Sequence, residues 1–182
     1  RVVGRPYAKV DGAAKVTGQT KFADDVMLPR MLHCKLLRSK IAHAKIRSID
    51  VSRALAAPGV VAIATGKDLP TPFGILPVSQ DEHALCLDRV RFVGDPVAAV
   101  AALDEDAAFE AAMKIKVHYE PLKTIFTPEE ALANPEPRLH DYADEGNLHK
   151  VLSMEFGDVD AGFAEADRVF EDLFFYDGNT HL

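Results

Sequence analysis

Short segments with alternating or β-branched apolar residues run along this chain, and they predict β-strands. Leu32, Cys34 and Leu36 are separated by polar residues, which predicts a half-buried strand with these three side chains facing the core. Further strands are expected at 44–48, 60–65, 89–93 and 115–119. The run from Pro96 to Leu103 is apolar throughout, which is typical of a strand buried on both faces.

Capping residues between these segments predict short helices at 52–57, 104–114 and 127–134 and after Asp158. The second helix has the clearest ends, because Asp104 is a favourable N-cap and Lys114 complements the negative end of the helix dipole. Thr127 begins the third helix as part of a capping box. Ser52 is the expected cap of the first. Strands and helices in this order predict an α+β fold, a mixed β-sheet with flanking helices.

The polar segment 134–149 contains two prolines and is the best domain boundary in the chain. It separates a domain at 1–145 from the start of a second domain at 146–182. The first domain begins with an extended arm at 1–29, which shows little periodicity. The second part is expected to contain two strands and a hairpin turn, at 151–156, 169–176 and Asp177-Gly178.

Composition narrows the class of protein without indicating an activity. The chain has 182 residues, of which 48% are hydrophobic and 27% charged, as in globular domains. The net charge of -7 argues against nucleic-acid binding, which usually needs a basic excess. There is no signal peptide and no apolar run long enough to span a bilayer, so we expect a cytoplasmic protein. Cys34 and Cys86 lack disulfide or metal spacing, which predicts two buried thiols.

Motifs for catalysis and metal binding are missing from the sequence. No two of the seven histidines show the i, i+4 spacing of zinc proteases, and there is no G-x-S-x-G turn. Gly4, Gly12 and Gly18 do not lie between a strand and a helix, which excludes a dinucleotide fingerprint. The segment 91–96 is interpreted as a turn between two strands. We therefore assign no catalytic, cofactor-binding or metal-binding residue.

A local basic cluster surrounds an expected turn and consists of Arg38, Lys40, Lys45 and Arg47. Such a cluster can steer an anionic substrate, for example a coenzyme A ester. It can also be a solvated strand edge that charge protects from aggregation. We favour this second interpretation, because charged side chains are mostly exposed and solvated.

Residues 37–46 read LRSKIAHAKI, and further distinctive segments follow one another at 11–25, 50–68, 93–101, 117–122 and 157–167. In content and order, these segments resemble the large subunits of molybdenum hydroxylases, the family of xanthine dehydrogenase and aldehyde oxidase. Residues 37–46 are similar to the family's RSPHAHARI stretch, with Lys40 in place of the proline and Ile41 in place of the first histidine. The resemblance implies an α/β-hammerhead domain followed by the first elements of a molybdopterin-binding domain.

Residues 71–78 and 88–96 are most similar to the large subunit of 4-hydroxybenzoyl-CoA reductases. This resemblance implies an oxidoreductase that removes a phenolic hydroxyl group from an aromatic CoA thioester. It also implies a molybdopterin cofactor in the full-length subunit, and FAD and iron–sulfur clusters on partner subunits. The alternatives are an oxidative hydroxylase of the xanthine, nicotinate or aldehyde dehydrogenase type, and a non-catalytic hammerhead interaction module.

The chain begins with Arg1 and ends with Leu182, which favours a piece of a longer subunit. The resemblance implies that the pterin-binding and catalytic residues lie beyond Leu182, so we expect this piece to be inactive and to bind no cofactor. It would serve as a channel wall and a subunit-docking domain, with the proline-containing loop 69–88 in contact with a partner or the channel. Residues 150–182 contain several aromatic side chains and are expected to self-associate when nothing covers them.

Overall fold

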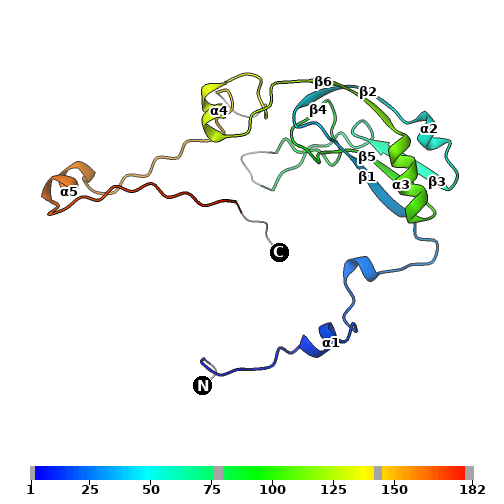
Figure 1. The fold of residues 1–182 in the computed structure, drawn as a ribbon, viewed down its shortest axis with the longest axis horizontal. Coiled ribbons are helices and arrows are strands. Elements are labelled where there is room, and N and C mark those ends of the chain that lie inside the picture. Colours follow the sequence, from blue (N-terminus) through cyan, green and yellow to red (C-terminus); the bar gives the residue numbers. More distant parts are fainter. Residues whose placement is uncertain (1–2, 76–79, 142–144, 179–182) are drawn as a thin grey trace. The chain divides into compact units, whose positions relative to one another are not determined.

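The computed structural model describes residues 3–75, 80–141 and 145–178, which belong to two compact units. Unit 1 is Arg1–Leu148 and unit 2 is His149–Leu182. Unit 1 contains both β-sheets and four of the α-helices, and α5 lies in unit 2 (Figure 1). Among the described residues, no helix is long and apolar enough to cross a membrane.

The chain begins with an arm that is mostly exposed, although the arm is less extended than the sequence predicts. It contains the short helix α1 (Gly12–Val16) and the 3-10 helix η1 (Ala23–Asp25). Asp11 and Lys15 form an ion pair across the turn of α1. This i, i+4 pair stabilises a single turn, which the lack of apolar periodicity did not indicate.

The first sheet has three antiparallel strands in the order β1-β5-β3. These strands are β1 (His33–Arg38), β3 (Val60–Thr65) and β5 (Pro96–Ala102). The helices α2 (Ser52–Leu55) and α3 (Glu105–Lys114) pack on one face of this sheet (Figure 1). β5 is the central strand of this sheet, which explains why its sequence is apolar throughout. This agrees with the prediction of a strand buried on both faces.

Small side chains fill the interface between the first sheet and its helices. The buried cluster consists of Ala54, Ala98, Val100, Ala111, Ala112 and Ile115. Alanine allows the helix backbone to approach the sheet closely, and Gly59 does the same beside Ala107. The α3 helix begins as predicted, because the Asp104 carboxylate accepts a hydrogen bond from the Ala107 N–H at 2.8 Å.

The orientation of β1 is opposite to the prediction. His33, Lys35 and Leu37 face inward, whereas Cys34 and Leu36 are exposed. The inward face meets α3, where the Lys35 ammonium group forms an ion pair with Glu105. The aliphatic part of a lysine can cover an apolar surface while its charged end reaches solvent, so alternation alone assigned the wrong face. The prediction that Cys34 is buried is wrong for the same reason.

The second sheet is also antiparallel and has the strand order β4-β2-β6. It comprises β2 (Ala44–Asp50), β4 (Arg89–Val90) and β6 (Lys116–Pro121). A second buried cluster, formed by Ala44, Cys86, Val90 and Val97, joins the two sheets because Val97 belongs to β5. The strand expected at 89–93 is shorter in the structure. It ends at Val90, and residues 91–93 belong to the turn that leads to β5.

Two of the three remaining helix caps are confirmed. Thr127 caps α4 (Pro128–Ala133) by accepting from the Glu130 N–H at 3.1 Å, and Asp158 caps α5 (Val159–Glu165) by accepting from Ala161 at 2.9 Å. The prediction for Ser52 is wrong. Ser52 is the first residue inside α2, and its hydroxyl group donates to the Asp50 carboxylate at 2.6 Å.

Unit 2 does not contain the two strands expected at 151–156 and 169–176. The backbone of both segments lies outside strands and helices, with no ladder partner among the described residues. A β-strand exists only when a neighbouring strand completes its hydrogen bonds, and a strand-like sequence does not supply that neighbour. A hairpin turn was expected at 177–178. The residues that would complete it, 179–182, lie outside the described part of the chain.

Candidate functional site

Two sequence segments that carry the resemblance meet at one end of the first sheet. The backbone N–H of Ser39 donates to the Asp95 carbonyl oxygen at 2.8 Å, and the N–H of Gly94 donates to the Ser39 carbonyl oxygen at 2.8 Å. The Arg38 guanidinium group adds a hydrogen bond to the Gly94 carbonyl oxygen at 2.9 Å. Gly94 has a φ of +100°, a conformation that glycine adopts without strain. The segment 91–96 is a turn, as predicted, and β1 fixes its position.

Asp95 is buried and stabilises this turn from within. Its carboxylate accepts a hydrogen bond from the Arg91 N–H at 2.8 Å. The thiol of Cys86 lies beside it. Burial, followed by a hydrogen bond to Asp95 and the negative charge of that carboxylate, raises the pKa of the Cys86 thiol. Cys86 is therefore a protonated, unreactive thiol, as the prediction of a buried cysteine requires.

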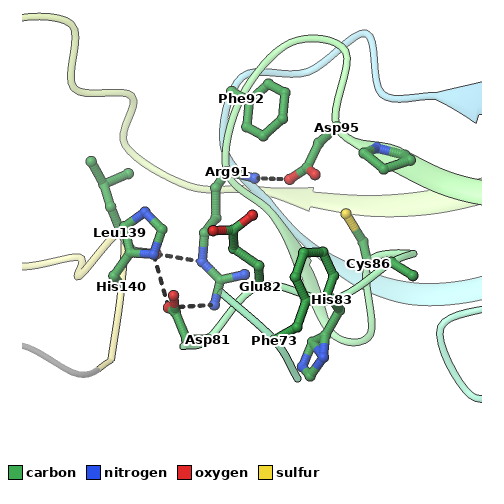
Figure 2. Close-up of a pocket in the computed structure, with 12 residues that line it drawn as sticks. Phe73, Asp81, Glu82, His83, Cys86, Arg91, Phe92, Asp95, Leu139 and His140 are labelled. Carbon is green, nitrogen blue, oxygen red and sulfur yellow. Dashed lines mark hydrogen bonds and ion pairs between the residues drawn. The ribbon is translucent and has the colours of Figure 1, made fainter. Parts of the chain in front are cut away.

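Next to this turn lies a hollow of about 550 Å³, formed by four separate segments of unit 1 (Figure 2). One wall holds Phe73 and Glu82, which form an isolated antiparallel bridge. Phe73 N–H donates to the Glu82 carbonyl oxygen at 2.8 Å, and Glu82 N–H donates back at 3.0 Å. Directly paired residues of an antiparallel bridge place their side chains on the same face, so both side chains can line the hollow.

Leu139 and His140 form the opposite wall, and Arg91 holds this wall in place (Figure 2). Its Nε donates to the Leu139 carbonyl oxygen at 2.6 Å, and its Nη2 lies 4.0 Å from Asp81. His140 Nδ1 lies 2.8 Å from the same Asp81 carboxylate. Arg89 adds a hydrogen bond to the Arg138 carbonyl oxygen at 3.3 Å. Charge-assisted hydrogen bonds of this kind are among the stronger ones, and here they hold two distant segments together.

Asn147 closes the segment that follows α4. Its Oδ1 accepts from the Leu139 N–H at 2.8 Å, and its Nδ2 donates to the Asn134 carbonyl oxygen at 2.8 Å. These bonds lie within the segment, and the bonds from Arg89 and Arg91 join it to the rest of unit 1. We call residues 134–141 and 145–148 the strap.

The basic cluster of the sequence analysis is divided between the two sheets. Arg38 lies on β1 and bonds to the Gly94 carbonyl oxygen, whereas Arg47 lies on β2 and forms an ion pair with Glu120. Lys40 and Lys45 are exposed. Because both arginines already have partners, the structure favours a structural role for them over the steering of an anionic substrate.

The hollow does not fit a molybdopterin cofactor. The described residues also contain no group of three or more His, Cys, Asp or Glu side chains able to hold a bare metal ion. The hollow is lined by three carboxylates, Asp81, Glu82 and Asp95, which would repel the phosphate of a pterin. We derive no catalytic step from this part of the chain.

Sequence reasoning missed the residues around the hollow. Arg91 and Leu139 are 48 positions apart, and Asp81 and His140 are 59 positions apart. No spacing rule connects such positions, and the segment containing Arg91 was interpreted only as a turn. The one signal in the sequence was the proline-containing loop 69–88, which we expected to contact a partner or the channel.

The fold, two antiparallel sheets joined by a small core, is that of solved molybdenum and aldehyde oxidoreductases. Quinoline 2-oxidoreductase from Pseudomonas putida 86 aligns with a TM-score of 0.69 at 34% identity, over 80% of this chain and 19% of the other. Aldehyde oxidoreductase from Desulfovibrio desulfuricans aligns with a TM-score of 0.69 at 30% identity, over 81% of this chain and 17% of the other.

The family model for the aldehyde oxidase and xanthine dehydrogenase a/b hammerhead domain matches residues 17–123, so the chain belongs to this family. The nicotinate dehydrogenase large molybdopterin subunit of Eubacterium barkeri is 41% identical over 100% of this chain and 42% of its own length. A probable xanthine dehydrogenase subunit of Bacillus subtilis is 41% identical over 95% of this chain and 23% of its own length. The chain thus spans less than half of the length of either relative.

Proposed function

We propose that this chain is the hammerhead part of the molybdenum-containing subunit of an oxidative hydroxylase that acts on a nitrogen heterocycle or a purine. The observation that carries the proposal is the 41% identity to a nicotinate dehydrogenase subunit over the whole of this chain. A similar identity to a probable xanthine dehydrogenase subunit supports the same class of reaction. The oxidative alternative of the sequence analysis thereby becomes the first candidate.

A 4-hydroxybenzoyl-CoA reductase is the second candidate. It is favoured by the similarity of residues 71–78 and 88–96 alone. Residues 76–79 lie outside the described part of the chain, so the similarity at 71–78 rests on the sequence. The division of the basic cluster weakens the case for binding a coenzyme A ester at that place.

Within such an enzyme, we assign unit 1 to the wall of the substrate channel and to the docking of partner subunits. The exposed loop residues Leu69 and Ile75 support this role, because a solvent-exposed apolar loop is a common contact surface. Residues 146–182 would begin the molybdopterin-binding domain. The cofactor itself, and the FAD and iron–sulfur clusters of partner subunits, would be held by residues outside this chain.

The test is expression of the complete reading frame with its neighbouring genes, followed by measurement of molybdenum and of turnover. Nicotinate, xanthine and an aldehyde are offered with an electron acceptor, and 4-hydroxybenzoyl-CoA with a strong one-electron donor. We expect molybdenum and hydroxylation of a heterocycle. Formation of benzoyl-CoA would select the second candidate. An assembled complex without molybdenum would favour a non-catalytic interaction module, as would a reading frame that stops at Leu182.

A further inference from the structure

The hollow beside β4 and the turn 91–96 is shaped before any ligand arrives. Its walls come from residues near 73, 81–86, 91–96 and 139–140, and each wall is fixed by hydrogen bonds. Its volume of about 550 Å³ lies in the range of small-molecule sites. A site that needs no rearrangement loses little free energy in ordering its own side chains on binding.

Two aromatic side chains at the hollow remain open to solvent. Phe73 is 49% exposed and Phe92 is 56% exposed, although both lie next to buried residues of unit 1. Phenylalanine is more commonly buried, and two of them at one concave surface offer contacts to a flat apolar ligand. The hollow therefore favours an aromatic ring over a sugar or a free phosphate.

The charged side chains around the hollow determine whether a cation or an anion is favoured there. Arg91 is the one cationic side chain of permanent charge in the lining, and its guanidinium group is already occupied by Leu139 and Asp81. The Glu82 side chain is exposed, and among the described residues its carboxylate has neither a hydrogen bond nor an ion pair with another residue. Figure 2 shows it directed toward the other lining side chains rather than back into its own loop. An acceptor without a partner beside aromatic walls attracts a donor that carries positive charge.

We propose that this hollow is a binding site for a small planar aromatic cation, such as an aryl amidinium ion or a protonated nitrogen heterocycle. The cation donates to the Glu82 carboxylate, and its ring contacts Phe73 and Phe92. This site belongs to the hammerhead domain and goes beyond the proposed catalytic function, because its lining residues are assigned to no catalytic step. Anionic ligands are disfavoured by Asp81, Glu82 and Asp95 together.

The test is a titration of the ¹⁵N-labelled 182-residue chain with benzamidine, followed by NMR. Benzamide, a neutral molecule of the same shape, and benzoate, an anion, are titrated in parallel. We expect saturable shifts of the Phe73, Glu82 and Phe92 amides, with a dissociation constant on the order of 1 mM for so small a ligand. Benzamide should bind roughly fivefold more weakly, as for one exposed charge-assisted contact, and benzoate should not saturate.

Three variants make the assignment specific. Glu82→Gln keeps the shape of the side chain and should remove the preference for benzamidine over benzamide. Phe92→Leu should weaken both ligands, and Glu110→Gln on α3 is the matched control that should leave both unchanged. Equal affinity for benzamidine, benzamide and benzoate, or shifts that map away from Phe73 and Phe92, would overturn the proposal. Amides far from the hollow should keep their chemical shifts in every variant. This shows that the variant is folded, so a loss of binding is not caused by a loss of structure.

Discussion

Gly66 and Cys86 approach so closely that a β-carbon added to Gly66 would lie 2.3 Å from the Cys86 carbonyl oxygen. The contact is with backbone, and Cys86 is held in place because its N–H donates to the Pro96 carbonyl oxygen at 2.7 Å. The end of β3 and the loop that carries Cys86 are therefore packed without room for a side chain. This contact brings together the first sheet and the buried cluster that joins the two sheets.

Gly66→Ala should therefore destabilise unit 1 by at least about 2 kcal/mol, because the backbone must move to relieve the overlap. Urea denaturation followed by circular dichroism measures this loss. Gly12→Ala is the control, since the added β-carbon would be 3.4 Å from the Lys9 β-carbon. A Gly66→Ala protein with the midpoint of the parent chain would contradict the packing described.

Arg91→Gln should loosen the strap beside the hollow, while Arg89 still donates to the Arg138 carbonyl oxygen. The substitution removes the 2.6 Å hydrogen bond to the Leu139 carbonyl oxygen and leaves Asp81 with His140 alone. The expected cost is about 1 to 3 kcal/mol. Hydrogen exchange measured by mass spectrometry should become faster in peptides covering residues 134–141. The exposed Arg53→Gln is the matched control, and equal exchange in both variants would exclude the proposed attachment.

The stability contribution of Asp68 should depend on pH. Hydrogen bonds from the N–H of Thr65, at 2.7 Å, and from its hydroxyl group lower the pKa of the Asp68 carboxyl group below its ordinary value of 3.8. A lowered pKa means that the ionised form stabilises the folded state above the ordinary value, and that this contribution is lost as the pH falls through the lowered pKa. Asp68→Ala should thus shift the urea midpoint more at pH 7 than at about pH 2.5. Equal shifts at both values would contradict the role of the charge.

The two cysteines should react with thiol reagents at very different rates. Cys34 is exposed on β1, whereas Cys86 is buried and its raised pKa keeps it protonated. In the native chain, iodoacetamide followed by mass spectrometry should label Cys34 first, and Cys86 only after unfolding in urea. Cys34→Ser should abolish the fast reaction. Fast labelling that persists in Cys34→Ser would show that Cys86 is accessible.

The 182-residue chain should self-associate through unit 2. Leu173 is 100% exposed and Phe174 to Tyr176 are each at least 87% exposed, in a segment of strand-like sequence that has no ladder partner among the described residues. Such segments pair with each other by completing their backbone hydrogen bonds. Light scattering after size-exclusion chromatography should give a mass above that of one chain, and removal of residues 149–182 should restore the monomer. Leu173→Asp should have the same effect, and an unchanged mass in both variants would argue against pairing through this segment.

Local chemistry made several elements predictable. Asp104, Thr127 and Asp158 cap helices because each side chain reaches an N–H three residues ahead, and such a contact needs no distant partner. The apolar composition of β5 likewise indicated the centre of a sheet. The family resemblance extended these predictions to the hammerhead fold, which the comparisons confirm.

The remaining features depend on contacts that no local pattern encodes. The inward face of β1 is the one that packs against α3, where Lys35 pairs with Glu105, 70 positions away. The hollow depends on Arg91, which meets Leu139 across the fold. Unit 2 shows the converse case, because its sequence favours strands but its described neighbours provide no ladder. The periodicity of a sequence indicates which secondary structure a segment can form. The neighbouring segments determine whether that structure forms.

The strand order β1-β5-β3 has a consequence for synthesis on the ribosome. β1 and β3 do not pair with each other, and β5, which is made after them, is the one strand with which either pairs among the described residues. At translation rates of about 5–20 residues per second, the apolar β3 therefore waits roughly 2–7 s before β5 has been made. During this interval the two outer strands of the first sheet have no ladder to join, and a chaperone that holds apolar segments would act on them.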